Sequence, residues 1–97
     1  MKLVWLPRAI ADLTDIRAYI ADHDPGAARP AATRIRTVVG HLKAHPSLGR
    51  PSNVEGLREI SVPGLPYVIP YRVKNERIEL LRVFHTARQR PENWRDE

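Results

Sequence analysis

The chain has 97 residues, enough for one domain with a modest hydrophobic core and too few for two, so we expect a single domain over residues 1–97. With 42% hydrophobic and 28% charged residues, the composition is that of a folded globular protein and excludes an intrinsically disordered chain. The lack of cysteine excludes disulfides and thiolate metal ligands. No other metal signature is present, and we expect no cofactor.

The sequence also lacks the features of an exported or membrane protein. No apolar run approaches the length that crosses a bilayer, and Met1–Arg8 lacks the apolar region of a signal peptide. We therefore expect a cytoplasmic protein. The formal net charge is +5, and lysine occurs only at Lys2, Lys43 and Lys74, so arginine carries most of the positive charge. The planar guanidinium group suits carboxylates and phosphates, which favours an acidic partner. The alternative is a solvated basic surface without a ligand.

The first half of the chain predicts one strand and two helices. Met1–Leu6 is apolar and β-prone, which predicts an opening strand. Apolar residues then recur at steps of three and four, which predicts an amphipathic helix over Pro7–Asp22. Asp24 is placed to cap a second helix that begins at Pro25, and the apolar stripe of this helix runs from Ala28 to Leu42. Pro30 interrupts this stripe, so the second helix either starts later or is kinked there.

The second half of the chain predicts strands. A long surface loop, His45–Gly56, is rich in Pro, Gly, Ser and Asn. The apolar period then changes from helical to alternating, which predicts strands over Leu57–Val62, Tyr67–Val73 and Arg77–His85. Short turns join these strands, as in an antiparallel meander. A polar tail, Thr86–Glu97, ends the chain.

Two details of the strands bear on the site. Pro70 lies within a predicted strand and cannot donate a backbone hydrogen bond, which predicts an edge position or a bulge. An unbroken last strand places four residues on one face: Ile78, Leu80, Arg82 and Phe84. The order β-α-α-β-β-β then predicts an α+β fold of two layers, with a helical hairpin packed on one face of a mostly antiparallel sheet.

Short segments with a characteristic order and spacing cover nearly the whole chain. They are Pro7, Asp12-Leu13, Ile16 and Tyr19-Ile20 on the first helix, Gly49-Arg50 in the loop, Leu57-Arg58-Glu59-Ile60, Tyr67–Val73, and Ile78–His85 followed by Ala87-Arg88-Gln89, Pro91 and Trp94. Together they resemble the RelE/ParE family, the toxins of type II toxin–antitoxin systems. The resemblance implies the two-layer fold described above.

The resemblance also implies a function and a partner. RelE-type members cut mRNA in the ribosomal decoding site without a metal, whereas ParE-type members poison DNA gyrase. The first helix and the ending Arg82-Val83-Phe84-His85 with Arg88 are closer to the ParE branch. The implied activity is therefore inhibition of gyrase, neutralised by an acidic antitoxin, ParD-like or similar, in a hetero-oligomer. The alternatives are a ribosome-dependent mRNA endonuclease and an antitoxin-binding relic whose toxicity has decayed.

RNA cleavage without a metal needs a base, an acid and a cation at the phosphate. The resemblance implies that the nuclease branch draws these groups from its central strands and its tail. Here Val68 stands where that branch tends to have an arginine. Trp94 stands near the place of a tail tyrosine or histidine, and an indole is neither an acid nor a base at neutral pH. If the chain is a nuclease, His85 and Arg88 are its candidate catalytic residues; otherwise His85 is structural.

A group of basic and aromatic residues is the candidate surface for a target or an antitoxin. Its members are Arg58, Arg72, Arg82, Arg88, Arg90 and Trp94. Neighbouring strands can bring such arginines into one patch, although Arg58 can instead pair locally with Glu59 or Glu79. Arg82 shares a face with apolar residues and therefore needs a carboxylate, which the antitoxin can supply. Trp94 is either a contact residue or, as we prefer, the anchor of the tail.

Overall fold

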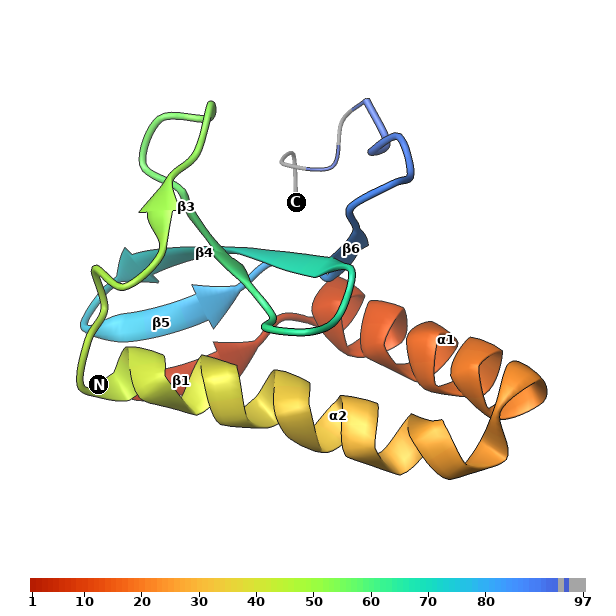
Figure 1. Ribbon diagram of the computed structural model, residues 1–97. Coiled ribbons are helices and arrows are strands. Elements are labelled where there is room, and N and C mark those ends of the chain that lie inside the picture. Colours follow the sequence, from red (N-terminus) through yellow and green to blue (C-terminus); the bar gives the residue numbers. More distant parts are fainter. Residues whose placement is uncertain (93, 95–97) are drawn as a thin grey trace.

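Two helices cover one face of a mixed six-stranded sheet, so the predicted α+β fold of two layers is confirmed (Figure 1). The structure is a computed structural model, and it describes residues 1–92 and Trp94. The elements follow one another in the order β1 (Lys2–Trp5), α1 (Pro7–His23), α2 (Pro25–Gly40), the 3₁₀ turn η1 (His41–Lys43), β2 (Arg50–Pro51), β3 (Arg58–Ser61), β4 (Tyr67–Lys74), β5 (Arg77–Leu80) and β6 (Phe84–His85).

The sheet is mostly antiparallel, as predicted. Its strands lie in the order β1-β5-β4-β3-β2, and β6 also pairs with β4. β1 runs parallel to β5, with Leu3 opposite Ile78, while the other pairs are antiparallel. The short strand β2 lies within the segment predicted as a loop, where Arg50 pairs with Glu59 of β3.

Both helices begin with a proline, whose fixed φ and missing N–H suit the first helical position. α2 starts at Pro25 and continues through Pro30, so a later start is wrong, and the helix loses one backbone hydrogen bond there. The predicted cap is also wrong, because the Asp24 side chain makes no capping bond to the described chain. Instead its backbone N–H donates to the Ile20 carbonyl at 2.7 Å, which closes the link between the helices.

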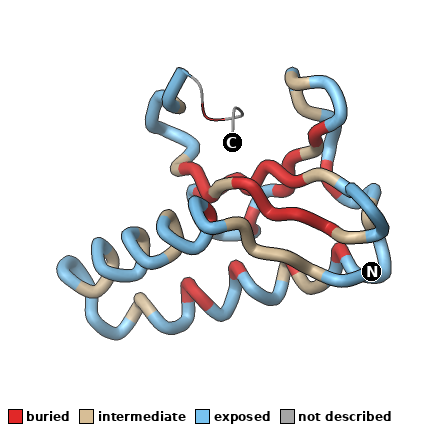
Figure 2. The backbone as a smooth tube through the Cα atoms, turned by 180° about the vertical axis from the view of Figure 1, so that it is seen from behind, coloured by how far each residue is buried: buried red, intermediate tan, exposed pale blue. Residues whose placement is uncertain are grey.

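Two apolar clusters lie on opposite faces of the sheet. The larger lies under the helices and includes Ile35 of α2, Ile69 of β4 and Leu80 of β5, all fully buried. The smaller lies on the other face and comprises Leu57, Val68, Leu81, Phe84 and Trp94. Figure 2 shows buried residues along the strands and along one side of α2, whereas α1 is mostly exposed. The loop after β2 and the tail after β6 both rise from the face away from the helices (Figure 1).

A bulge breaks the last predicted strand, so the prediction of one continuous strand and the predicted position of Phe84 on its face are both wrong. Tyr71 pairs with Leu80, and Val68, three residues earlier, pairs with Phe84, four residues later, so one extra residue lies between β5 and β6. A shift of one residue moves the following side chains to the opposite face. Phe84 therefore packs in the smaller cluster, not beside Ile78 and Leu80 as predicted.

Pro70 lies beside this bulge. It belongs to β4, which has neighbours on both sides, so the edge position is wrong and the bulge is the correct alternative. The proline nitrogen cannot donate, but the Pro70 carbonyl accepts a hydrogen bond from the Leu81 N–H at 3.0 Å.

Candidate functional site

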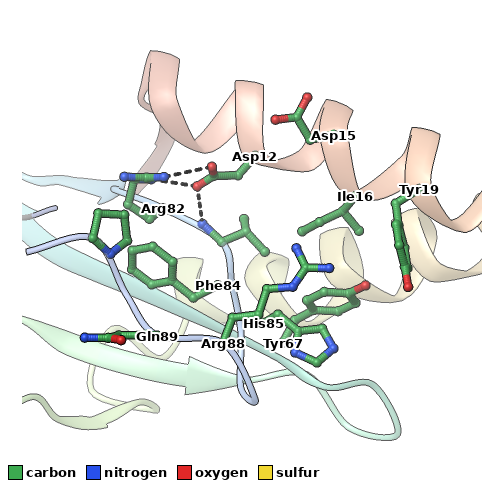
Figure 3. A pocket seen from close by; sticks show the side chains of 12 residues that line it. Asp12, Asp15, Ile16, Tyr19, Tyr67, Arg82, Phe84, His85, Arg88 and Gln89 are labelled. Atoms are coloured by element: carbon green, nitrogen blue, oxygen red, sulfur yellow. Dashed lines mark hydrogen bonds and ion pairs between the residues drawn. The ribbon is translucent and has the colours of Figure 1, made fainter.

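The bulge is held by a carboxylate from α1. Asp12 accepts hydrogen bonds from Arg82 Nε at 2.7 Å, from Arg82 Nη2 at 3.0 Å and from the backbone N–H of Val83 at 2.9 Å (Figure 3). Both charged side chains are mostly buried, with 14% of Arg82 and 16% of Asp12 exposed. Arg82 therefore does need a carboxylate, as predicted, but its own chain supplies one and the antitoxin is not required for this.

A pocket of about 230 Å³ lies next to this ion pair, between α1 and the segment that starts at β6. Asp15 and Tyr19 of α1 line one side, while Tyr67, His85 and Arg88 line the other (Figure 3). The Tyr67 and His85 rings meet edge to face with centroids 5.6 Å apart, because Tyr67 and His85 are paired residues of β4 and β6. The Arg88 guanidinium lies 5.5 Å from the centroid of the Tyr19 ring. The two candidate catalytic residues, His85 and Arg88, thus share this pocket.

A backbone hydrogen bond fixes the tautomer of the neutral His85 ring. The Ala87 N–H donates to His85 Nδ1 at 3.1 Å. Since Nδ1 is the acceptor, the neutral ring carries its proton on Nε2. In this state Nε2 is a hydrogen-bond donor and cannot take a proton from a substrate.

A second cluster on the opposite face of the sheet holds the tail. Glu59 of β3 accepts hydrogen bonds from Arg90 at 2.6 and 3.1 Å and pairs more loosely with Arg50 at 3.4 Å. The hydrogen bonds from Arg90 lower the pKa of the Glu59 carboxyl, against the opposite effect of its burial. Arg90 also lies 5.1 Å from the Phe84 ring and 5.5 Å from the Trp94 ring. Trp94 is only 6% exposed and packs edge to face on Phe84, as a tail anchor would.

The remaining predicted arginines lie in separate places. Arg72 pairs with Glu79 at 2.6 Å, and its hydrogen bond lowers the pKa of that carboxyl. Arg58 donates to the Gly49 carbonyl at 2.7 Å, so it does not pair locally with Glu59 or Glu79 as the alternative had it. The structure thus does not gather the predicted residues into one patch. Arg82 and Arg88 line the first pocket, Arg90 and Trp94 the second cluster, and Arg58 and Arg72 lie apart from both.

Several residues that line the first pocket were not predicted as site residues, among them Asp12, Tyr19 and Tyr67. Asp12 lies off the apolar stripe of its helix, and Tyr19 and Tyr67 read as parts of a helix and a strand. The available signal was the conjunction of Tyr67 and His85 at the ends of predicted neighbouring strands. Among the described residues, no cluster of three or more His, Asp or Glu side chains is placed to hold a metal ion. No described helix is long and apolar enough to span a membrane.

Comparison with known proteins defines the class to which this fold and site belong. Residues 3–90 match the family described as the ParE toxin of the type II toxin–antitoxin system parDE. The chain therefore belongs to the ParE toxin family.

Individual relatives agree with this assignment. The chain is 41% identical to toxin RelE2 of Caulobacter vibrioides over 90% of its length and 97% of that protein. It is 38% identical to the protein Y4kP of Sinorhizobium fredii over 94% of both chains. Among solved structures it resembles a chain of the chromosomal ParDE system from P. aeruginosa, with a TM-score of 0.81, 34% identity and coverage of 88% of this chain and 95% of that one.

Proposed function

We propose that this ParE-family toxin inhibits DNA gyrase by binding, without catalytic residues of its own, and that an acidic antitoxin neutralises it in the cytoplasm. Membership of the ParE family supports the target. The structural relative from a ParDE system and the net charge of +5 support an acidic, ParD-like partner in a hetero-oligomer.

The state of His85 is the observation that carries the non-enzymatic part of this proposal. A general base must present an unprotonated nitrogen to the substrate. Nδ1 of His85 already accepts the Ala87 N–H, and the neutral ring therefore has only a donor at Nε2. A nuclease that uses His85 would have to break this hydrogen bond before each proton transfer.

Two other positions support the same conclusion. Val68 and Trp94 stand where the resemblance implies catalytic groups in the nuclease branch, and both are buried in the smaller apolar cluster. A buried valine and an indole supply neither a cation nor an acid–base group to an RNA.

The alternative is cleavage of mRNA on the ribosome, with His85 and Arg88 as the catalytic residues. It is favoured by two relatives named RelE2 and RelE3 and by the presence of both residues in one pocket. In that case Arg88 would meet the scissile phosphate and His85 would move the proton.

Induction of the chain alone in a bacterium distinguishes these functions. We expect DNA synthesis to fall first, with filamentation, and we expect His85→Ala to be as toxic as the wild type. The opposite result is an early fall in protein synthesis with cut mRNAs, and the loss of both effects in His85→Ala. It would refute the gyrase proposal and support the nuclease. Normal growth with soluble toxin present would indicate the decayed relic.

A further inference from the structure

Tyr67 has a polar group that its own chain leaves unused. Its side chain is only 5% exposed, and its hydroxyl has no hydrogen-bond partner among residues 1–92 and 94. The same residue lines the 230 Å³ pocket. Burial raises the pKa of Tyr67, so the hydroxyl remains a donor at neutral pH. Arg77 Nε is the only buried polar side-chain atom without a partner in the described part of the chain, so the Tyr67 hydroxyl is not sealed in the interior and a ligand in the pocket can reach it.

Further unused donors line the same pocket. His85 presents Nε2–H, because Nδ1 is taken by the Ala87 N–H. Arg88 contacts the Tyr19 ring but has no carboxylate partner in the described part of the chain. Arg72, Arg82 and Arg90, in contrast, each have one. A site lined by such donors is complementary to an oxyanion.

We infer that this pocket is the receptor for a single carboxylate side chain of the antitoxin, which Tyr67, His85 and Arg88 bind together. The identity of the partner rests on the function proposed above. The binding of a carboxylate does not depend on whether gyrase is the target.

The walls of the pocket favour a carboxylate over a nucleic-acid phosphate. α1 contributes the acidic residues Asp12 and Asp15, and within residues 1–92 and 94 only Asp12 forms an ion pair, with Arg82. Asp15 would repel a polyanionic backbone more than it would repel one carboxylate. Ile16 and Phe84 also line the pocket and offer apolar contact to the stem of an acidic side chain.

A neighbouring groove explains how a protein segment would reach this pocket. Tyr67 also lines a mainly apolar groove of about 330 Å³ with Ile20, Ala31 and Leu65, between the helical hairpin and the turn before β4. Because Tyr67 borders both spaces, one segment can lay apolar residues in the groove and extend an acidic side chain into the pocket. This pattern fits an acidic, amphipathic segment that orders on binding.

The first test uses small anions on the purified toxin. Butyrate, a carboxylate on an apolar stem, should shift the His85 ring resonances in a saturable way, and inorganic phosphate should do so more weakly. Tyr67→Phe removes only the unpartnered hydroxyl, so the variant should fold normally and bind butyrate about tenfold less tightly. Tyr71→Phe is the matched control. It removes a hydroxyl that accepts from the Gly49 N–H and donates to the Pro46 carbonyl, so it should lower stability and leave butyrate binding unchanged.

The second test uses the purified antitoxin. Tyr67→Phe and Arg88→Ala should each weaken its binding at least tenfold, whereas Arg36→Ala, an exposed arginine of α2 outside this pocket, should not. Saturable binding of phosphate without butyrate would overturn the inference in favour of a nucleic-acid ligand. Failure of both anions to bind, or unchanged antitoxin affinity in the Tyr67 and Arg88 variants, would also overturn it. If the toxin does not inhibit gyrase but the Tyr67→Phe and Arg88→Ala variants bind the antitoxin more weakly as expected, only the proposed target is refuted.

Discussion

Replacement of Asp12 by alanine tests whether this carboxylate holds the bulge in place. The variant leaves the Arg82 guanidinium and the Val83 N–H without their carboxylate. Removing one partner of a fully buried ion pair costs about 3–5 kcal/mol. Because the two side chains keep 14% and 16% exposure, water can partly replace the lost partner, and we expect a loss of about 2–3 kcal/mol.

This loss is large for a domain of this size. One kcal/mol shifts the Tm of such a domain by roughly 4–8 °C, so the Tm of Asp12→Ala should fall by about 10–20 °C. Urea unfolding followed by circular dichroism measures the same loss at constant temperature. Asp15→Ala is the matched control, since Asp15 is exposed on the same helix and should change stability by no more than about 0.5 kcal/mol.

A double-mutant cycle with Arg82→Met isolates the interaction between the two side chains. Residues in direct contact show coupling energies of about 0.5–3 kcal/mol, and a bidentate pair should lie in the upper half of that range. A coupling energy near zero, or an Asp12→Ala variant as stable as Asp15→Ala, would show that the ion pair of Asp12 and Arg82 does not stabilise the bulge.

Other predictions concern the loop and the tail. Gly49→Ala should lower the free energy of unfolding, measured with urea, by about 1–3 kcal/mol, because its Cβ would lie 2.6 Å from Tyr71 Cε1 and 2.7 Å from the Glu59 carbonyl oxygen. A variant as stable as the wild type would show that the loop can move to accommodate the methyl group. Since the folded pKa of Glu59 is lowered, its contribution to stability is present above the ordinary carboxyl pKa and is lost as the pH falls through the folded value. Glu59→Gln should therefore reduce the loss of stability on acidification, and an unchanged pH profile would contradict this. The same variant frees Arg90 and should speed tryptic cleavage after Arg88, whereas unchanged cleavage would show that Glu59 does not hold the tail.

The fold could be predicted because its signals are local. Apolar residues at helical spacing indicated both helices, and alternation indicated the strands, so the two-layer α+β arrangement followed from burial of their apolar faces. The parallel pairing of β1 with β5 joins distant parts of the chain, and no local pattern specifies it.

The bulge could not be predicted for a related reason. The run from Ile78 to His85 alternates well enough for one continuous strand, and a shift of one residue leaves its composition unchanged. What stabilises the shift is Asp12, 70 residues before Arg82 in the chain. The sequence therefore indicated that Arg82 needs a carboxylate but not which carboxylate it meets.

The candidate site was predictable only in part. His85 and Arg88 were recognised as a pair, and the structure places both in one pocket. Tyr67 joins them because β6 pairs with β4, and the bulge sets the register that places Tyr67 opposite His85. The strand pattern indicated that the two residues lie near each other, but it did not specify this register.

The most direct test of the central claim is a cleavage assay with purified gyrase and closed circular plasmid. We expect the toxin to trap gyrase on broken DNA, so that linear plasmid accumulates after denaturation of the enzyme. His85→Ala should trap as much as the wild type, because His85 has no catalytic part in this account. Unaffected gyrase, together with mRNA cut on purified ribosomes and intact mRNA with His85→Ala, would contradict the account and identify a nuclease.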